Sequence, residues 1–220
     1  MNPRMYTEVA SAPGLWFAAL QPPHGTTHDS VADALTNAAT AQVPVSALVD
    51  DDREGVNEVI LTRDPSITHG TPATADCADA ARALADAHGW EYRMGFGTAA
   101  GAAVGVDGTA AGVIVLMGLR ERYFRGATSY SVLDVHDGLA HHGVTEYQLR
   151  SGWLFSARHL GHGVRTHDEP ATLLSVAAAD LDAVADVAFS FGQMRLIVAD
   201  LAHDRTYVLR QPIEHTAHLS

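Results

Sequence analysis

Hydrophobic and polar residues follow two periods along this chain, one typical of strands and one of helices. Short apolar or alternating runs, closed by proline, glycine or acidic residues, predict strands. They cover residues 14–20, 43–49, 56–62, 90–96, 148–157, 171–177, 194–199 and 206–209. Apolar residues at helical spacing, with polar caps before them, predict helices. They cover residues 29–42, 74–88, 131–142 and 180–190.

The order of these elements predicts an α+β fold. Strand–helix–strand units recur, and Asp107-Gly108 between two apolar runs is a hairpin signal. We therefore expect a mixed or largely antiparallel sheet with helices packed on one face. Residues 1–220 are expected to form a single globular unit with a loose tail at residues 211–220. Two related ferredoxin-like halves, residues 1–125 and 126–210, are one interpretation of the repeated order.

Three polar or glycine-rich stretches interrupt the pattern. Residues 50–55 (DDDREG) are expected to form a solvated acidic turn, since they lack the spacing of a calcium loop. Residues 95–100 (GFGTAA) match the GxGxxA form of a dinucleotide loop, but the hairpin signal follows where that loop needs a helix. We therefore expect strand glycines there and no bound nucleotide. Residues 161–170 are expected to form a polar loop.

Composition narrows the cellular setting and the partners. The longest apolar run, residues 110–119, is half the length of a membrane span, and the first ten residues do not resemble a secretory signal. A single cysteine, Cys77, suits a reducing compartment, so we expect a cytoplasmic protein. The net charge of −12 argues against nucleic-acid and membrane partners.

The candidate chemistry lies among the 13 histidines. Histidine and carboxylate side chains are ligands of zinc-like divalent metals. The densest group combines His159, His162, His167 and Asp168. A similar loop, residues 24–29 (HGTTHD), contributes His24 and His28 if the two loops meet in space. Solvated loops also accumulate histidine, and the spacing matches no established zinc signature.

Residues 169–176 (EPATLLSV), the turn Phe191-Gly192-Gln193 and residues 196–198 (LIV) carry one resemblance. This segment of about 30 residues resembles the C-terminal part of a small, uncharacterised bacterial α+β domain family. The resemblance implies a turn between a helix and an edge strand, and it implies no activity.

Two classes of function remain open from the sequence. The first is a non-catalytic protein-interaction or accessory module that binds another protein or a second copy of itself. The alternative is a small metal-dependent hydrolase or lyase that uses the histidine and carboxylate cluster. Convergence in one pocket would favour the enzyme, and the residues concerned are His159, His162, His167 and Asp168.

Overall fold

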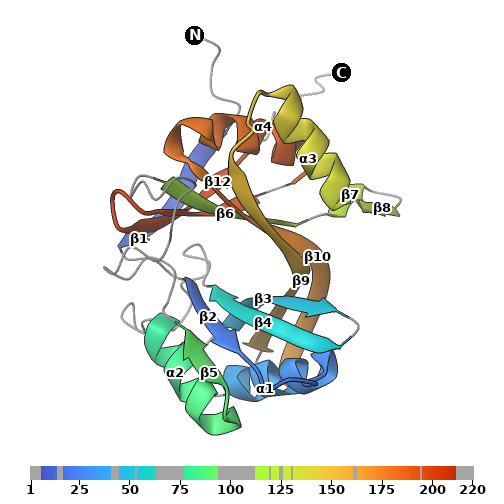
Figure 1. Ribbon diagram of the computed structural model, residues 1–220, viewed down its shortest axis with the longest axis vertical. Coiled ribbons are helices and arrows are strands. Elements are labelled where there is room, and N and C mark those ends of the chain that lie inside the picture. The colour runs from blue at the N-terminus through green and yellow to red at the C-terminus, as the bar shows by residue number, and fades with distance from the viewer. Residues whose placement is uncertain are drawn as a thin grey trace, which may run out of the picture.

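One antiparallel sheet of ten strands organises the part of the chain that the structure describes (Figure 1). The computed structural model describes residues 6–13, 17–40, 45–52, 54–62, 77–93, 112–118, 120–123, 126–129, 131–160, 163–193 and 195–211. The strands follow the order β1-β12-β11-β6-β10-β9-β3-β4-β2-β5, and each neighbouring pair is antiparallel. The expected α+β class with a largely antiparallel sheet is therefore confirmed.

The α1–α2 half of the molecule lies at the bottom of Figure 1. Its elements are β2 (Phe17–Gln21), α1 (His28–Thr40), β3 (Val45–Asp52), β4 (Gly55–Thr62), α2 (Cys77–His88) and β5 (Glu91–Arg93). Thr27 caps the start of α1, because its Oγ1 accepts a hydrogen bond from the Ser30 N–H at 3.2 Å. Buried apolar residues of α1 and α2 pack on β2, β3 and β4 in one hydrophobic cluster.

The α3–α4 half lies at the top of Figure 1. Its elements are β6 (Gly112–Gly118), α3 (Val132–His141), β9 (Tyr147–Leu160), β10 (Gly163–Ala177), the short 3-10 helix η2 (Ala178–Asp180), α4 (Leu181–Ser190) and β11 (Arg195–Asp200). Ser131 and Asp134 cap α3 reciprocally, which stabilises its first turn. The helices approach closely at Gly138, where a Cβ would lie 2.9 Å from Val187 Cγ1.

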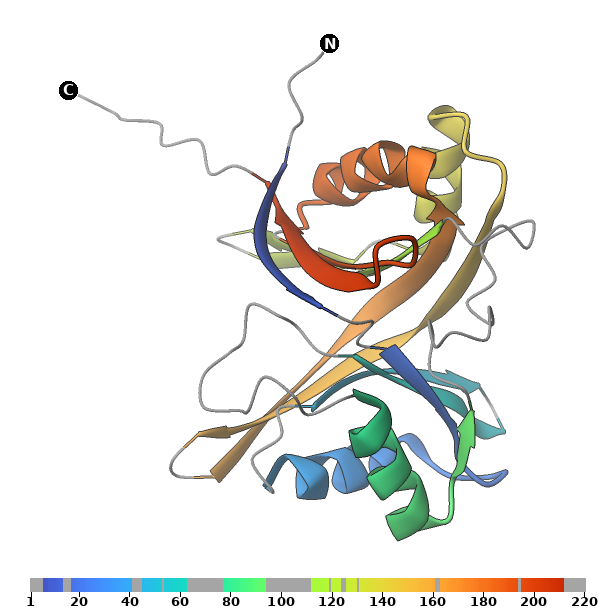
Figure 2. The same ribbon diagram turned by 90° about the vertical axis from the view of Figure 1, so that its left-hand side faces the viewer.

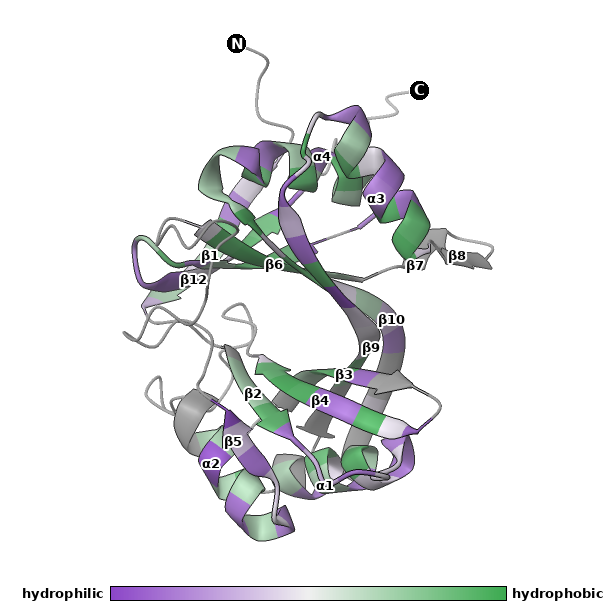
Figure 3. Ribbon diagram, viewed as in Figure 1, coloured by the Kyte–Doolittle hydropathy of each residue, from purple (hydrophilic) through white to green (hydrophobic). Residues whose placement is uncertain are grey.

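Two strands extend this half, and a small hairpin stands apart from the sheet. β12 (Arg205–Arg210) pairs with β11, and β1 (Thr7–Pro13) pairs with β12 at the edge. β7 (Arg120–Tyr123) and β8 (Gly126–Ser129) form a separate pair. Helix α3, helix α4 and the strands beneath them share a second hydrophobic cluster. In Figure 3, β6 is hydrophobic along its length, as expected for a strand whose side chains are buried on both faces of the sheet.

The long hairpin of β9 and β10 runs through both halves (Figure 2). Residues Tyr147–Leu160 of β9 pair with β10 throughout, and residues 153–157 of β9 also pair with β3. Gly152 lies where β9 meets the backbone of β3, and a Cβ at this position would lie 2.1 Å from the Val49 carbonyl oxygen. Only glycine allows this approach of the two strands.

A third hydrophobic cluster contains strand residues from both halves of the molecule. Its buried members all lie on strands, including Leu48 and Ile60 of the α1–α2 half and Ile114 and Leu173 of the other half. Along β6, for example, Ile114 belongs to this cluster, whereas Val113 and Val115 belong to the cluster under α3 and α4. The alternation places the third cluster and the cluster under α3 and α4 on opposite faces of β6.

Three expectations from the sequence are corrected. The expected loop at residues 161–170 is wrong from residue 163 onward, because these residues form the first part of β10 and pair with β9. Pro170 fits there because β10 pairs with β6 only from Ala171 onward. Asp50 to Asp52 continue β3 instead of starting a turn, and β1 was not expected at all.

Some expectations concern residues at or beyond the boundaries of the described chain. The GxGxxA stretch, the Asp107-Gly108 hairpin and residues 212–220 of the tail lie outside the described residues. The division into halves at residue 125 stays a prediction. β6 precedes residue 125 in the chain, but it pairs with β10 and β11, which both come after that residue. Among the described helices, none is both long and apolar enough to cross a membrane.

Candidate functional site

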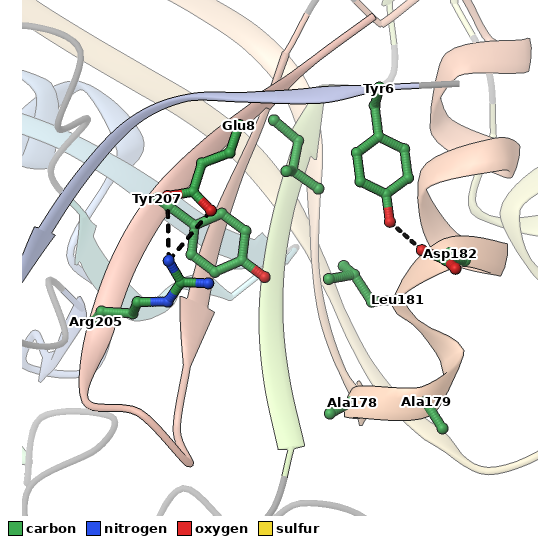
Figure 4. Close-up of a pocket in the computed structure, with 9 residues that line it drawn as sticks. Tyr6, Glu8, Ala178, Ala179, Leu181, Asp182, Arg205 and Tyr207 are labelled. Atoms are coloured by element: carbon green, nitrogen blue, oxygen red, sulfur yellow. Dashed lines mark hydrogen bonds and ion pairs between the residues drawn. The ribbon is translucent and has the colours of Figure 1, made fainter. Parts of the chain in front are cut away.

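A cavity of about 310 Å³ lies between the β1–β12 edge of the sheet and the start of α4 (Figure 4). Its size is at the lower end of the roughly 300–1,000 Å³ typical of small-molecule pockets. It therefore suits one side chain or a small ligand. The described residues that line it are Tyr6, Glu8, Ala178, Ala179, Leu181, Asp182, Arg205, Tyr207 and Leu209.

Strand alternation brings these side chains to the same face of the sheet. Arg205, Tyr207 and Leu209 occupy every second position of β12, and successive side chains of a strand point to opposite faces. On β1, Glu8 pairs with Leu209 and Ala10 pairs with Val208, so Val9 is an extra residue in a bulge. Glu8 thus shares the face of Leu209 and lies over the cavity.

Arg205 is held in place from three sides. Its Nη1 lies 3.1 and 3.2 Å from the two carboxylate oxygens of Glu8, and its Nε lies 3.6 Å from Asp200 Oδ2. The guanidinium carbon stands 4.4 Å from the ring centroid of Tyr207. An exposed ion pair such as Arg205–Glu8 contributes only about 0–1 kcal/mol, so its main effect here is to fix the orientation of the guanidinium.

Asp200 supports Arg205 from the turn between β11 and β12. Its Oδ1 accepts hydrogen bonds from the N–H groups of Ala202 and His203, both at 3.2 Å. Its Oδ2 lies 2.8 Å from His203 Nδ1. Asp204 completes the turn with a φ of 47°, in the left-handed region that aspartate tolerates better than most residues. The side chain of Asp200 thus stabilises the turn that leads into β12 at Arg205.

The opposite wall of the cavity comes from Tyr6 and α4. Tyr6 is 7% exposed, and its hydroxyl donates a hydrogen bond to Asp182 Oδ1. Its ring packs against Phe189 of α4, with the ring centroids 6.1 Å apart. Asp182 lies in the first turn of α4, where a negative charge is stabilised by the helix dipole.

The site is acidic overall. Among the described residues, the carboxylates of Glu8, Asp182 and Asp200 surround the guanidinium of Arg205, so acidic side chains outnumber the basic one by two. Two tyrosine rings provide amphipathic walls. Such a site can bind a cationic or hydrogen-bonding group against an aromatic surface.

The cavity adjoins the outermost strand at this edge of the sheet. In the described part of the chain, β1 has a neighbour on one side only, and Val9 in its bulge is 47% exposed. The strand at the other edge, β5, has only three residues, two of them charged. Short, charged edge strands oppose pairing with other chains, whereas β1 is a longer edge with one charged residue.

The structure describes five of the six residues expected to bind a metal, and they lie in the turn before α1, in α1, in β9 and in β10. His24 Nε2 is 3.5 Å from Glu54 Oε2, and both side chains are strongly exposed. His28 begins α1, with its ring edge-on to Trp153 of β9 at 6.5 Å between centroids. His159 lies six residues beyond Trp153 on β9, which corresponds to about 20 Å along the strand at 3.3 Å per residue.

The remaining members belong to β10 or to the connection before it. His167 and Asp168 lie on β10, and His167 pairs with Ser156, three positions before His159. His162 lies outside the described residues. Within the described residues, no three His, Cys, Asp or Glu side chains are grouped to hold a metal ion. The complete metal site, and the hydrolase or lyase that would use it, stay predictions.

The residues of the cavity were not predicted from the sequence. Tyr6 and Glu8 lie near one end of the described chain and Arg205 and Tyr207 near the other, so no local motif links them. The available signal was the alternation of residues 205–210 (RTYVLR), which predicted the strand β12 in part. A comparable signal at residues 7–13 (TEVASAP) is weak because alanine and proline are poor strand formers.

Comparisons of the chain with protein-family models, curated proteins and solved structures find no match.

Proposed function

We propose that this protein is a non-catalytic protein-interaction module that binds an extended segment of another protein along β1. The observation that carries this proposal is the outer edge of β1, which pairs with no other described strand and carries the exposed Val9 directly beside the cavity of Figure 4. An extended segment can add to such an edge as a further strand. Main-chain hydrogen bonds then supply affinity, and a pocket for alternate side chains supplies specificity.

We also propose that the scaffold consists of two related ferredoxin-like halves. The α1–α2 half has the element order β-α-β-β-α-β and the sheet order β3-β4-β2-β5. In the α3–α4 half, β6, α3, β9, β10, α4 and β11 repeat this order, with the sheet order β11-β6-β10-β9. Each half thus places its strands in the order 4-1-3-2, and their second strands, β3 and β9, pair with each other.

The residue pattern of β9 supports helices on one face of this shared sheet. Leu149 packs with the cluster under α3 and α4, and Phe155 belongs to the cluster under α1 and α2. These residues are six positions apart, so a regular strand directs them to the same face. β1 and β12 are additions to the α3–α4 half, and they create the edge that we assign to the partner.

The net charge favours a different protein over a second copy as the partner. At −12, two copies of this chain repel each other at long range, whereas a basic segment is attracted. Association of two copies through β1 is therefore the competing outcome. Light scattering at several concentrations distinguishes it, since a β1-mediated dimer would dissociate when Val9 is replaced by Glu.

The test uses synthetic seven-residue peptides selected from a random library on the folded protein. In an added strand, alternate peptide N–H groups face the sheet edge. We expect N-methylation of the set that faces β1 to weaken binding more than tenfold, and methylation of the other set to have little effect. Equal loss for both sets, or no peptide binding at all, would contradict strand addition.

A pair of protein variants locates the binding edge. Val9→Glu places a charge on β1, and charged side chains on an edge oppose pairing. Leu133→Glu is the matched control, because Leu133 is 71% exposed on α3 and is also a solvent-facing aliphatic residue. We expect Val9→Glu to reduce peptide binding and Leu133→Glu to leave it unchanged. If Leu133→Glu weakened peptide binding and Val9→Glu did not, the peptide would not bind along β1.

A further inference from the structure

We infer that the cavity beside β1 binds a cationic side chain, arginine or lysine, of the extended segment. This inference rests on the proposed function and specifies the chemistry of the partner. The cavity borders β1, and Glu8 of β1 is part of its lining. An added strand directs every second side chain to the face of the sheet on which Glu8 and Tyr207 lie, so one of them reaches the cavity.

The charges at the cavity favour a cation. Arg205 is already matched by Glu8 and Asp200, whose carboxylates both contact its guanidinium. Asp182 on the opposite wall adds a further negative charge. Its carboxylate can accept about four hydrogen bonds, so it can bind an incoming guanidinium or ammonium while it accepts the hydrogen bond that the Tyr6 hydroxyl donates.

The protein already stabilises one guanidinium at this place by the same chemistry. Arg205 lies over the ring of Tyr207 and is paired with a carboxylate. A second cationic side chain would meet the Asp182 carboxylate with the Tyr6 ring at its side (Figure 4). Charge-assisted hydrogen bonds and aromatic neighbours both stabilise such a group.

The volume and the walls limit what else can occupy the cavity. At about 310 Å³ it is small for a cofactor. An anionic side chain would be attracted by the N-terminal end of α4, but Asp182 already lies in that first turn. An anion would also face the carboxylates of Glu8 and Asp182, which makes a cation the favoured occupant.

The experiment varies the single peptide position that points into the cavity. A peptide that binds β1 is prepared with arginine, citrulline, norleucine or glutamate at that position. Citrulline keeps the shape of arginine and removes its charge. By isothermal titration calorimetry we expect the arginine peptide to bind about tenfold more tightly than the citrulline peptide, and the glutamate peptide to bind most weakly.

Asp182→Asn tests the residue that we hold responsible for this preference. We expect the ratio between arginine and citrulline peptides to fall toward one in Asp182→Asn. Asp180→Asn is the matched control, because Asp180 lies two positions away at the start of α4, outside the cavity lining, and makes no capping hydrogen bond with its side chain. The control should keep the tenfold ratio.

The outcomes separate this inference from the proposed function. If all four peptides bind equally and remain sensitive to N-methylation, strand addition holds and the cationic pocket is wrong. Tightest binding of the glutamate peptide would replace it with an anion pocket. If no peptide binds, both proposals are wrong.

Discussion

Replacing Gly152 by alanine tests the joint between the two halves of the molecule. An ideal Cβ at this position would lie 2.1 Å from the Val49 carbonyl oxygen, 2.8 Å from the Val49 carbonyl carbon and 3.1 Å from Asp50 Cα. Ordinary contacts of a Cβ begin near 3.4 Å. All three neighbours are main-chain atoms, so no side-chain rotation can relieve the overlap. Either β9 or β3 must move.

The magnitude follows from how firmly those strands are held. Overpacking a well-packed site costs about 1–3 kcal/mol. Here β3 is paired on both sides, with β4 and with β9, so the local backbone has little room to adjust. We therefore expect a loss near the upper limit, about 3 kcal/mol. For a chain of this length, that corresponds to a decrease in Tm of roughly 6–12 °C.

Urea unfolding followed by circular dichroism measures this cost, with two glycines as controls. Gly138→Ala meets both Cγ atoms of the buried Val187, a cost of about 1–3 kcal/mol that is partly offset by about 1 kcal/mol of helix propensity, so we expect a net loss of about 1 kcal/mol. Gly89→Ala meets open space and has only the strain of a φ of +67°, about 1 kcal/mol. If Gly152→Ala lowers the free energy of unfolding no more than Gly89→Ala does, the backbones of β9 and β3 do not approach each other at Gly152 as closely as described.

Three further predictions concern individual polar groups. Ser131→Ala should lower the free energy of unfolding by about 1 kcal/mol through loss of the α3 cap, measured by urea unfolding. Hydrogen bonds from the Ser131 side chain and then its backbone lower the pKa of Asp134 below its usual 3.8. The Asp134 carboxylate therefore stabilises the fold above about pH 4, and the advantage over Asp134→Asn should fade as pH drops through the lowered pKa. Thr172→Val should stabilise the protein by about 1 kcal/mol, because the buried Thr172 hydroxyl has no hydrogen-bond partner among the described residues, whereas Thr172→Ser should not.

The helices could be predicted from the sequence because their signals are local. Ser131 with Asp134 three residues later marks the start of α3, and Gly143, with a φ of 78°, marks its end. The apolar residues Val135 and Leu139 lie four positions apart and are both fully buried. Each of these features depends on a few neighbouring residues, so a pattern in the sequence is sufficient.

The first part of β10 and the candidate site depend on distant partners. Residues 163–170 are polar and contain a proline, so the sequence favoured a loop there, but the long ladder with β9 determines their structure. The candidate site depends even more on distant partners, because Glu8 and Arg205 meet only through the pairing of β1 with β12. No periodic pattern reveals which two strands pair when most of the chain separates them.

The pairing of β1 with β12 also determines when the candidate site can form during synthesis of the chain. The ribosome makes Glu8 first, and its partner Arg205 follows 197 residues later. At about 5–20 residues per second, synthesis of the intervening chain takes roughly 10–40 s. During this time β1 has neither β12 nor the rest of the cavity beside it. Only a chain translated through residue 210 can present the edge that we assign to the partner, so products of premature termination would be unable to compete for it.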